Sequence, residues 1–299
     1  MRLLSFLVFL TITFSGCTLS KPQPTMSSLK DRISAELSQQ KGTFAVAFKD
    51  VQTGEEVLLQ EHENFHAAST MKTPVLVEAY KQIEAGKFTI DSPIEVKNNF
   101  KSIADSSTFS ITPTDDGDTE LYQHLGKTLP MSDLLYRMII KSSNLATNII
   151  IELVGAENVT ATMRNLGAQE IQVRRGVEDG KAYALGLNNT TTAYDLMLLY
   201  THLVQGKAVS PAASQAMIKI LLDQQYKDII PAKLPKDVQV AHKTGWITGV
   251  RHDSGIVFLP DGRKYVLVLL SKQLEDEPAA ISAMAQVSLL VYQHMLANH

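Results

Sequence analysis

The residues best suited to chemistry begin with a serine and a lysine three positions apart, Ser69 and Lys72. A serine hydroxyl is a weak nucleophile at its ordinary pKa and needs a base beside it. The apolar pattern predicts a helix over residues 69–85, and positions i and i+3 share a helix face, so Lys72 can reach the Ser69 hydroxyl. At the start of that helix, Ser69 would also expose its backbone N–H to a developing oxyanion. Alone, the pair is a weak signal, because an N-capping serine followed by a solvated lysine has the same spacing.

Two further polar segments make this pair more specific. Residues 142–144 read Ser-Ser-Asn and lie between apolar helical stretches, where polar side chains are costly unless they line a cleft. Residues 243–245 read Lys-Thr-Gly on a β-rich stretch. The absent side chain of Gly245 would let a substrate backbone approach the edge of that strand.

Ser-x-x-Lys, Ser-x-Asn and Lys-Thr-Gly, in this order, resemble the motifs of the penicillin-recognising serine hydrolases, and most closely those of class A β-lactamases and their penicillin-binding-protein relatives. The resemblance covers the chain from Ser28 to its C-terminus. It extends to Asn148 and to the segments at 189–192 and 252–256. It implies a serine β-lactamase that hydrolyses the β-lactam amide through an acyl-enzyme, with no metal and no cofactor.

The resemblance implies the roles of the groups that react. Ser69 would attack the amide carbonyl of the β-lactam ring, and Lys72 would handle its proton. Ser142 would relay a proton to the departing ring nitrogen. The backbone N–H groups of Ser69 and Trp246 would form the oxyanion hole.

The resemblance also implies the residues that hold the substrate. Asn144 would hydrogen-bond the amide of the substrate's side chain. Lys243 and Thr244 would bind the substrate carboxylate through charge-assisted contacts. Gly245 would leave room for the substrate along the strand.

The base for deacylation is where the sequence departs most from the family pattern. In class A enzymes it is a glutamate on a loop before a threonine-rich helix start, followed four residues on by an asparagine. Glu178 is the best match, because it follows Arg175 as an acid follows an arginine in the family. Ala182 stands where the asparagine is expected, and the stretch from Glu178 to Thr190 is shorter. The other interpretation is a solvated loop carboxylate, or a partner for Arg175 or Arg174.

Ser143 also departs from the pattern, because it replaces the aspartate of the middle motif. That aspartate mainly supports the turn, so its loss bears on local rigidity more than on chemistry. If the Lys72 amine acts as a base, its pKa must be lowered, and burial and the charge of Lys243 would both lower it.

Three other functions remain possible on the sequence. The first is a D,D-peptidase, an esterase or a β-lactam-binding sensor that acylates but deacylates slowly. The second is a non-catalytic binding module of the cell envelope on the same scaffold. The third is a zinc peptidase, because residues 62–66 match H-E-x-x-H. That motif must lie in a helix, whereas here it follows a predicted strand and precedes Pro74, which favours a polar connection instead.

The elements that must position these residues divide between strands at both ends and helices between them. We expect strands at 43–49, 55–60, 238–247, 255–259 and 265–271, and helices at 28–40, 69–85, 131–139, 145–154, 193–204 and 277–296, with another starting at Ser210 and Pro211. The prediction is an α/β fold: one antiparallel sheet, flanked by terminal helices, with an inserted all-α subdomain. Segment 98–129 fits no element, and its acidic tip predicts a surface loop or small extra module.

Composition limits the partners. Of 299 residues, 44% are hydrophobic and 20% charged, enough to bury a full core. The net charge of −3, with no run of Lys or Arg, excludes a basic nucleic-acid-binding stripe. The single cysteine, Cys17, excludes an intramolecular disulfide and a four-thiolate metal site. We expect a monomer that binds a small-molecule β-lactam substrate and no nucleic acid.

The first residues predict export. Arg2 precedes a short apolar run at 3–14, which cannot span the ~30 Å core of a bilayer and is typical of a signal segment. Small residues before Cys17 resemble a bacterial lipobox, although Phe14 stands where leucine is usual. We expect a lipoprotein-type signal peptide at 1–16, lipidation of Cys17, a tether at 17–27, and periplasmic or cell-surface location with the lipid as the only membrane contact. Ordinary secretory cleavage, which would leave a free thiol, is the alternative.

The remaining residues, 28–299, are predicted to form a single catalytic domain. Residues 28–68 and 210–299 would make its α/β part, and residues 69–209 its helical part.

Overall fold

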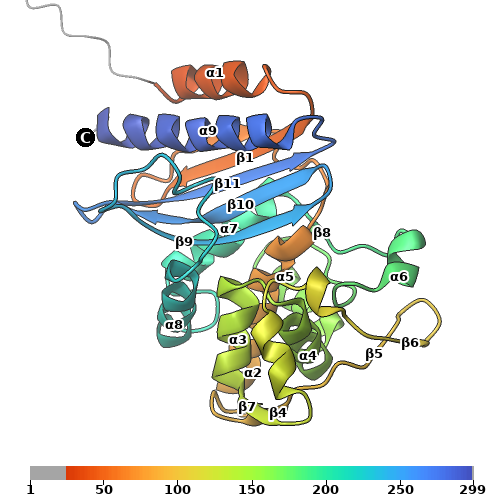
Figure 1. The fold of residues 1–299 in the computed structure, drawn as a ribbon. Helices are drawn as coiled ribbons and strands as arrows, with labels where there is room; N and C mark the ends of the chain where they lie inside the picture. Colours follow the sequence, from red (N-terminus) through yellow and green to blue (C-terminus); the bar gives the residue numbers. More distant parts are fainter. Residues whose placement is uncertain (1–24, 298–299) are drawn as a thin grey trace, which may run out of the picture.

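The structure, a computed structural model, describes residues 25–297, so the predicted signal segment and Cys17 lie outside the described residues (Figure 1). At its centre is a five-stranded antiparallel sheet in the order β2-β1-β11-β10-β9. The strands are β1 (Thr43–Asp50), β2 (Glu56–Leu59), β9 (Gln239–Ile247), β10 (Val250–Phe258) and β11 (Lys264–Lys272). Both ends of the chain therefore build one sheet, which confirms the predicted fold class, and β9 lies at its edge.

Two helices from opposite ends of the chain cover one face of this sheet (Figure 1). They are α1 (Met26–Leu37) and α9 (Glu277–Ala297), which also contact each other. Alternate residues of a strand point to opposite faces. Accordingly, Phe44, Val46 and Phe48 of β1 pack in the core beneath these helices, whereas Ala45 and Ala47 belong to the core on the other face. The length and apolar composition of α9 would suit a membrane span, but half of that span is buried within the fold.

The other face of the sheet carries the helical subdomain (Figure 1). α7 (Ala193–Val204) packs directly on β1, β10 and β11. α8 (Pro211–Leu222) begins as predicted, with proline in its first turn and the Ser210 hydroxyl accepting the backbone N–H of Ala213. The other long helices are α2 (Lys72–Glu84), α3 (Met131–Ile140), α4 (Asn144–Val154) and α5 (Ala156–Asn165).

Segment 98–129 consists of short strands and 3-10 turns, not a regular element. β5 (Phe100–Lys101) pairs with β6 (Thr108–Phe109), and β7 (Thr128–Pro130) returns the chain to β4 (Pro93–Glu95). The 3-10 turns are η2 (Pro113–Asp115) and η3 (Thr119–His124). Asp118 between them is buried and pairs with Arg137 of α3 at 2.8 Å, so part of the predicted surface loop is packed against the helices.

The loop that carries Glu178 lies beside the hairpin of β5 and β6. After Glu178 the chain forms α6 (Gly180–Ala184) and then β8 (Thr190–Thr191), which pairs with β3 (Phe65–His66). Lys181 of α6 pairs with Asp105 of the hairpin at 2.7 Å. These contacts hold the chain that follows Glu178.

Candidate active site

Ser69 lies in η1 (Ala68–Met71), a 3-10 turn that continues directly into α2. Residues i and i+3 stack in such a turn, which keeps Ser69 and Lys72 on one side. Ala68 has a left-handed φ of 44°, a conformation that costs energy for a residue with a side chain. The backbone N–H of Ala68 donates to His66 Nδ1 at 3.0 Å, and the Thr70 hydroxyl donates to the Ala67 carbonyl at 2.6 Å. The turn that presents Ser69 is therefore held by its neighbours.

Lys72 is fully buried and joins the first two motifs. Its Nζ donates to the Ser142 carbonyl at 2.7 Å, to Ser142 Oγ at 3.1 Å and to Asn144 Oδ1 at 2.8 Å. Burial lowers the pKa of Lys72 to about 7, although the charges of Asp116 and Glu178 oppose that change. Near neutral pH, much of Lys72 is therefore a neutral amine that can accept a proton.

Lys243, from the third motif, also contacts the Ser142 hydroxyl. Its buried Nζ lies 3.1 Å from Ser142 Oγ and donates to the Thr244 carbonyl at 2.8 Å. Burial and the charge of Lys72 lower the pKa of Lys243, and Asp253 opposes them. Because the Ser142 oxygen can accept from both lysines, its own proton remains free for donation.

Among residues 25–297, neither Lys72 nor Lys243 forms an ion pair with a carboxylate. Two buried amines that contact the same hydroxyl and have no carboxylate partner can bind an anion. The arrangement therefore favours a negatively charged group on whatever binds beside Ser142.

Strand β9 touches the turn of Ser69 because Gly245 has no side chain. A Cβ at Gly245 would lie 3.0 Å from the backbone nitrogens of both Ser69 and Thr70. At that distance the neighbouring atoms would have to shift. Trp246 follows on the edge strand, and its side chain is 59% exposed. The backbones of Ser69 and Trp246 thus lie on two segments in close contact.

Glu178 faces the serines from the opposite side. It has a left-handed φ of 60°, and its Oε1 accepts from the Asn144 side-chain amide at 3.1 Å. Burial and the nearby Asp115 raise the pKa of Glu178, while Lys72 and Arg175 lower it. Arg175 directs its hydrogen bonds elsewhere, to the carbonyls of Leu187 and Gly176 and to the side chain of Asn188.

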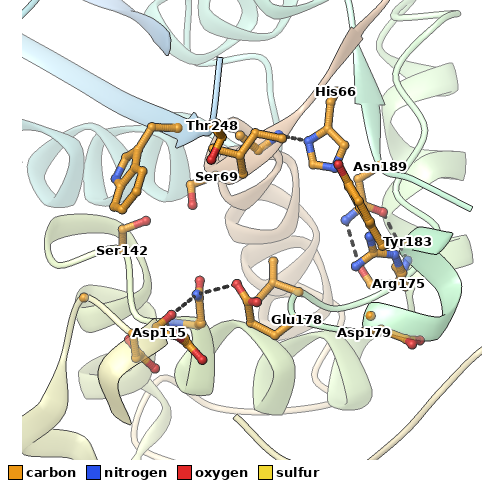
Figure 2. Close-up of a pocket in the computed structure, with 18 of the residues that line it drawn as sticks. His66, Ser69, Asp115, Ser142, Arg175, Glu178, Asp179, Tyr183, Asn189 and Thr248 are labelled. Carbon is orange, nitrogen blue, oxygen red and sulfur yellow. Dashed lines mark hydrogen bonds between the residues drawn. The ribbon is translucent and has the colours of Figure 1, made fainter. Parts of the chain in front are cut away.

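Ser69, Ser142, Asn144, Glu178 and Trp246 line one cavity of about 670 Å³. Figure 2 shows the labelled Ser69, Ser142 and Glu178 around the same open space. Lys72 and Lys243 are buried and contact the cavity residue Ser142, while Thr244 and Gly245 precede the cavity residue Trp246 on β9. The structure thus brings together every predicted site residue that lies within residues 25–297.

Asn148 holds the loop ahead of Glu178, a contact that the sequence did not predict. Its side chain accepts the backbone N–H of Val177 at 2.7 Å and donates to the Val177 carbonyl at 3.0 Å. A Cβ at Gly176 would lie 2.3 Å from Asn148 Oδ1, so any other residue there would have to displace the Asn148 side chain that holds the loop. The spacing of Asn148 after Asn144 was the available signal, but it did not reveal the partner.

The acidic segment contributes to the site as well. The backbone carbonyl of Asp115 accepts from the Asn144 side-chain amide at 2.8 Å, and Asp115 and Asp116 line the cavity. Asn144 therefore connects this segment, Lys72 and Glu178. These contacts could not be predicted from the sequence, because more than twenty residues separate the partners along the chain.

The H-E-x-x-H match at 62–66 does not form the helical zinc motif, since it ends in strand β3. Its side chains go to three separate partners: His62 to Glu170, Glu63 to Lys272, and His66 to the backbone of Ala68. Within the part of the chain that the structure describes, no group of three or more His, Cys, Asp or Glu residues is placed to hold a metal ion.

Comparison with known proteins agrees with this geometry. A model of the β-lactamase enzyme family matches residues 28–295. A β-lactamase of Bacteroides uniformis is 26% identical over 97% of this chain and 98% of its own length. The structure of a β-lactamase from Sphaerobacter thermophilus DSM 20745 is similar with a TM-score of 0.77 and 25% identity, covering 91% of this chain and 97% of that one. The structure of PBP-A is similar with a TM-score of 0.78 and 26% identity, covering 92% and 98%. The chain belongs to the β-lactamase enzyme family, whose members are serine hydrolases.

Proposed function

We propose that this protein is a serine β-lactamase of class A type, which hydrolyses the β-lactam amide through an acyl-enzyme on Ser69. One observation carries the proposal: two buried lysines from distant segments meet at the Ser142 hydroxyl, in a cavity that Ser69 also lines. This arrangement supports the proposed roles of Ser69 as nucleophile, Lys72 as base and Ser142 as proton relay.

Acylation can be written with every proton accounted for. The neutral Lys72 amine accepts the proton of Ser69 Oγ, which bonds to the carbonyl carbon of the ring. The backbone N–H groups of Ser69 and Trp246 stabilise the oxyanion. As the carbon–nitrogen bond breaks, Lys72 returns the proton through Ser142 to the ring nitrogen. Lys243, with Thr244, binds the substrate carboxylate.

Deacylation needs a base that holds a water. Glu178 takes a proton from that water, whose oxygen attacks the ester carbonyl, and Ser69 leaves with a proton. The contact between Glu178 and Asn144 supports this role, because Asn144 would also bind the substrate's amide. Because Ala182 stands where the family has an asparagine, another group must help Glu178 to hold the water.

The second candidate is a relative that acylates but deacylates slowly, such as a D,D-peptidase, an esterase or a β-lactam sensor. Ala182 and the similarity to PBP-A favour it. The test is nitrocefin turnover together with intact mass after mixing with a penicillin and a cephalosporin. We expect many turnovers per protein molecule. A stoichiometric adduct that persists without turnover would replace the proposal with the second candidate, and the absence of any adduct would overturn both.

We also propose that the mature protein is exported, monomeric and tethered through lipid at Cys17. The family model matches from residue 28, which is compatible with a signal at 1–16, a tether at 17–27 and one catalytic domain at 28–299. Radiolabelled palmitate should label the protein, and Cys17→Ser should abolish the label and release the protein from membranes. An unlabelled wild-type protein in the soluble fraction would contradict the anchor.

A further inference from the structure

We propose that Asp116 is a positioning residue for the catalytic turn at 142–144. From a separate segment, it supplies the carboxylate that Ser143 lacks, and it brings a negative charge that is linked to Lys72 through Asn144. This inference rests on the proposed acylation of Ser69, and it adds a residue that the motifs do not contain.

The carboxylate of Asp116 caps helix α4. The backbone N–H of Asn144 donates to Oδ1 at 3.0 Å, and that of Leu145 donates to Oδ2 at 2.7 Å. The first N–H groups of a helix have no partner within the helix, and a negative charge there is favourable. Asp116 therefore fixes where α4 begins, two residues after Ser142.

Ser143 cannot replace this carboxylate. Its hydroxyl accepts only the backbone N–H of Ala146 at 3.2 Å within its own helix, and it lies 3.4 Å from Asp116 Oδ2. Asp116 is itself oriented by the Tyr122 hydroxyl, which donates at 3.0 Å, and by the backbone N–H of Asp118 at 2.9 Å. The Asp116 carboxylate thus accepts hydrogen bonds both from its own segment and from the start of α4.

The segment around Asp116 is locked against the residue before the catalytic turn. A Cβ at Gly117 would lie 2.1 Å from the Lys141 carbonyl, so only glycine permits this approach. The buried Asp118 pairs with Lys141 at 3.1 Å and with Arg137 at 2.8 Å. Asp116 is therefore held at a set position relative to Ser142.

Asp116 is linked to Lys72 through Asn144. The backbone N–H of Asn144 donates to Asp116, while its side-chain oxygen accepts from Lys72 at 2.8 Å. The titratable groups that act on Lys72 are Asp116, Glu178 and Lys243. Burial lowers the pKa of Lys72, and of these groups Asp116 raises that pKa most.

Two roles make different predictions for Asp116→Asn. The amide keeps one acceptor but turns an N–H group toward a backbone N–H, so the turn loosens and acylation at high pH should fall about tenfold. Loss of the charge lowers the pKa of Lys72, so the rise of acylation with pH should move to lower pH. A merely structural role would reduce acylation at every pH without that movement.

The experiment measures acylation by a fluorescent penicillin from pH 5 to 9 in the full chain. It compares the wild type, Asp116→Asn, the double variant Asp116→Asn/Ser143→Asp, and Asp91→Asn as a control for loss of an exposed carboxylate. We expect the double variant to recover most of the rate and the wild-type pH profile. A uniform loss without a shift, or no recovery in the double variant, would overturn the proposal.

Hydrogen exchange provides a second test, which does not depend on catalysis. The amides of Asn144 and Leu145 should lose protection in Asp116→Asn and regain it in the double variant, while α9 keeps its protection. Unchanged exchange would show that Asp116 does not fix the turn. If the wild type is never acylated, the proposed function fails, and this exchange comparison still decides whether Asp116 positions residues 142–144.

Discussion

Acylation should rise with pH because Lys72 can accept the Ser69 proton only as a neutral amine. With the pKa of Lys72 lowered to about 7 by burial, about one tenth of the amine is neutral at pH 6 and about nine tenths at pH 8. The second-order rate constant for acylation should therefore increase about tenfold between pH 6 and pH 8. The rise follows from the requirement for a neutral amine. The lowered pKa makes the rate level off above pH 7, whereas an ordinary lysine would stay almost fully protonated across this whole range.

Stopped-flow measurement with a fluorescent penicillin isolates acylation from deacylation. Lys72→Arg provides the matching variant, since a guanidinium stays charged and cannot take the proton. We expect its acylation to fall by at least about 10³-fold at every pH, whereas Lys87→Arg on the surface should behave as the wild type. A rate that stays flat from pH 6 to 8, or an active Lys72→Arg, would show that another base acts.

Other changes test separate parts of the site. In Glu178→Ala the acyl-enzyme should persist, with deacylation slowed by about 10²–10⁴-fold in a mass-spectrometric time course, and unchanged turnover would refute the assigned base. In Gly245→Ala the new Cβ, 3.0 Å from the Ser69 nitrogen, should push the strand away from the oxyanion site and slow acylation by at least about tenfold, and equal rates would contradict that packing. Nitrocefin turnover should survive EDTA, because no step uses a metal, and its loss on chelation would favour metal-dependent chemistry.

The sequence predicted those parts of the fold that depend on local patterns. The helix at 193–204 has the predicted bounds, and Ser210 and Pro211 mark the start of α8, because capping and periodicity are read over a few residues. β10 starts at Val250, earlier than the expected strand at 255–259. His252 and Asp253 are buried polar residues there, and Asp253 is satisfied by His242 at 2.8 Å, a partner that periodicity cannot reveal.

The motifs predicted the residues around the cavity, but not the contacts that hold them. The segment at 98–129 has no periodicity, and its order depends on distant partners such as Asp118 with Arg137. In the same way, the Asp179 carboxylate accepts a hydrogen bond at 2.8 Å from the hydroxyl of Ser102, which lies in the β5–β6 hairpin. Such long-range polar contacts appear only once the chain is folded, because they have no fixed spacing in sequence.

The most direct test of the catalytic assignment is the mass of the protein after brief mixing with benzylpenicillin, followed by peptide mapping. We predict one adduct with the full mass of the antibiotic, located on the peptide that contains Ser69, and none in Ser69→Ala. An adduct on another residue, or β-lactam hydrolysis that persists in Ser69→Ala, would contradict it.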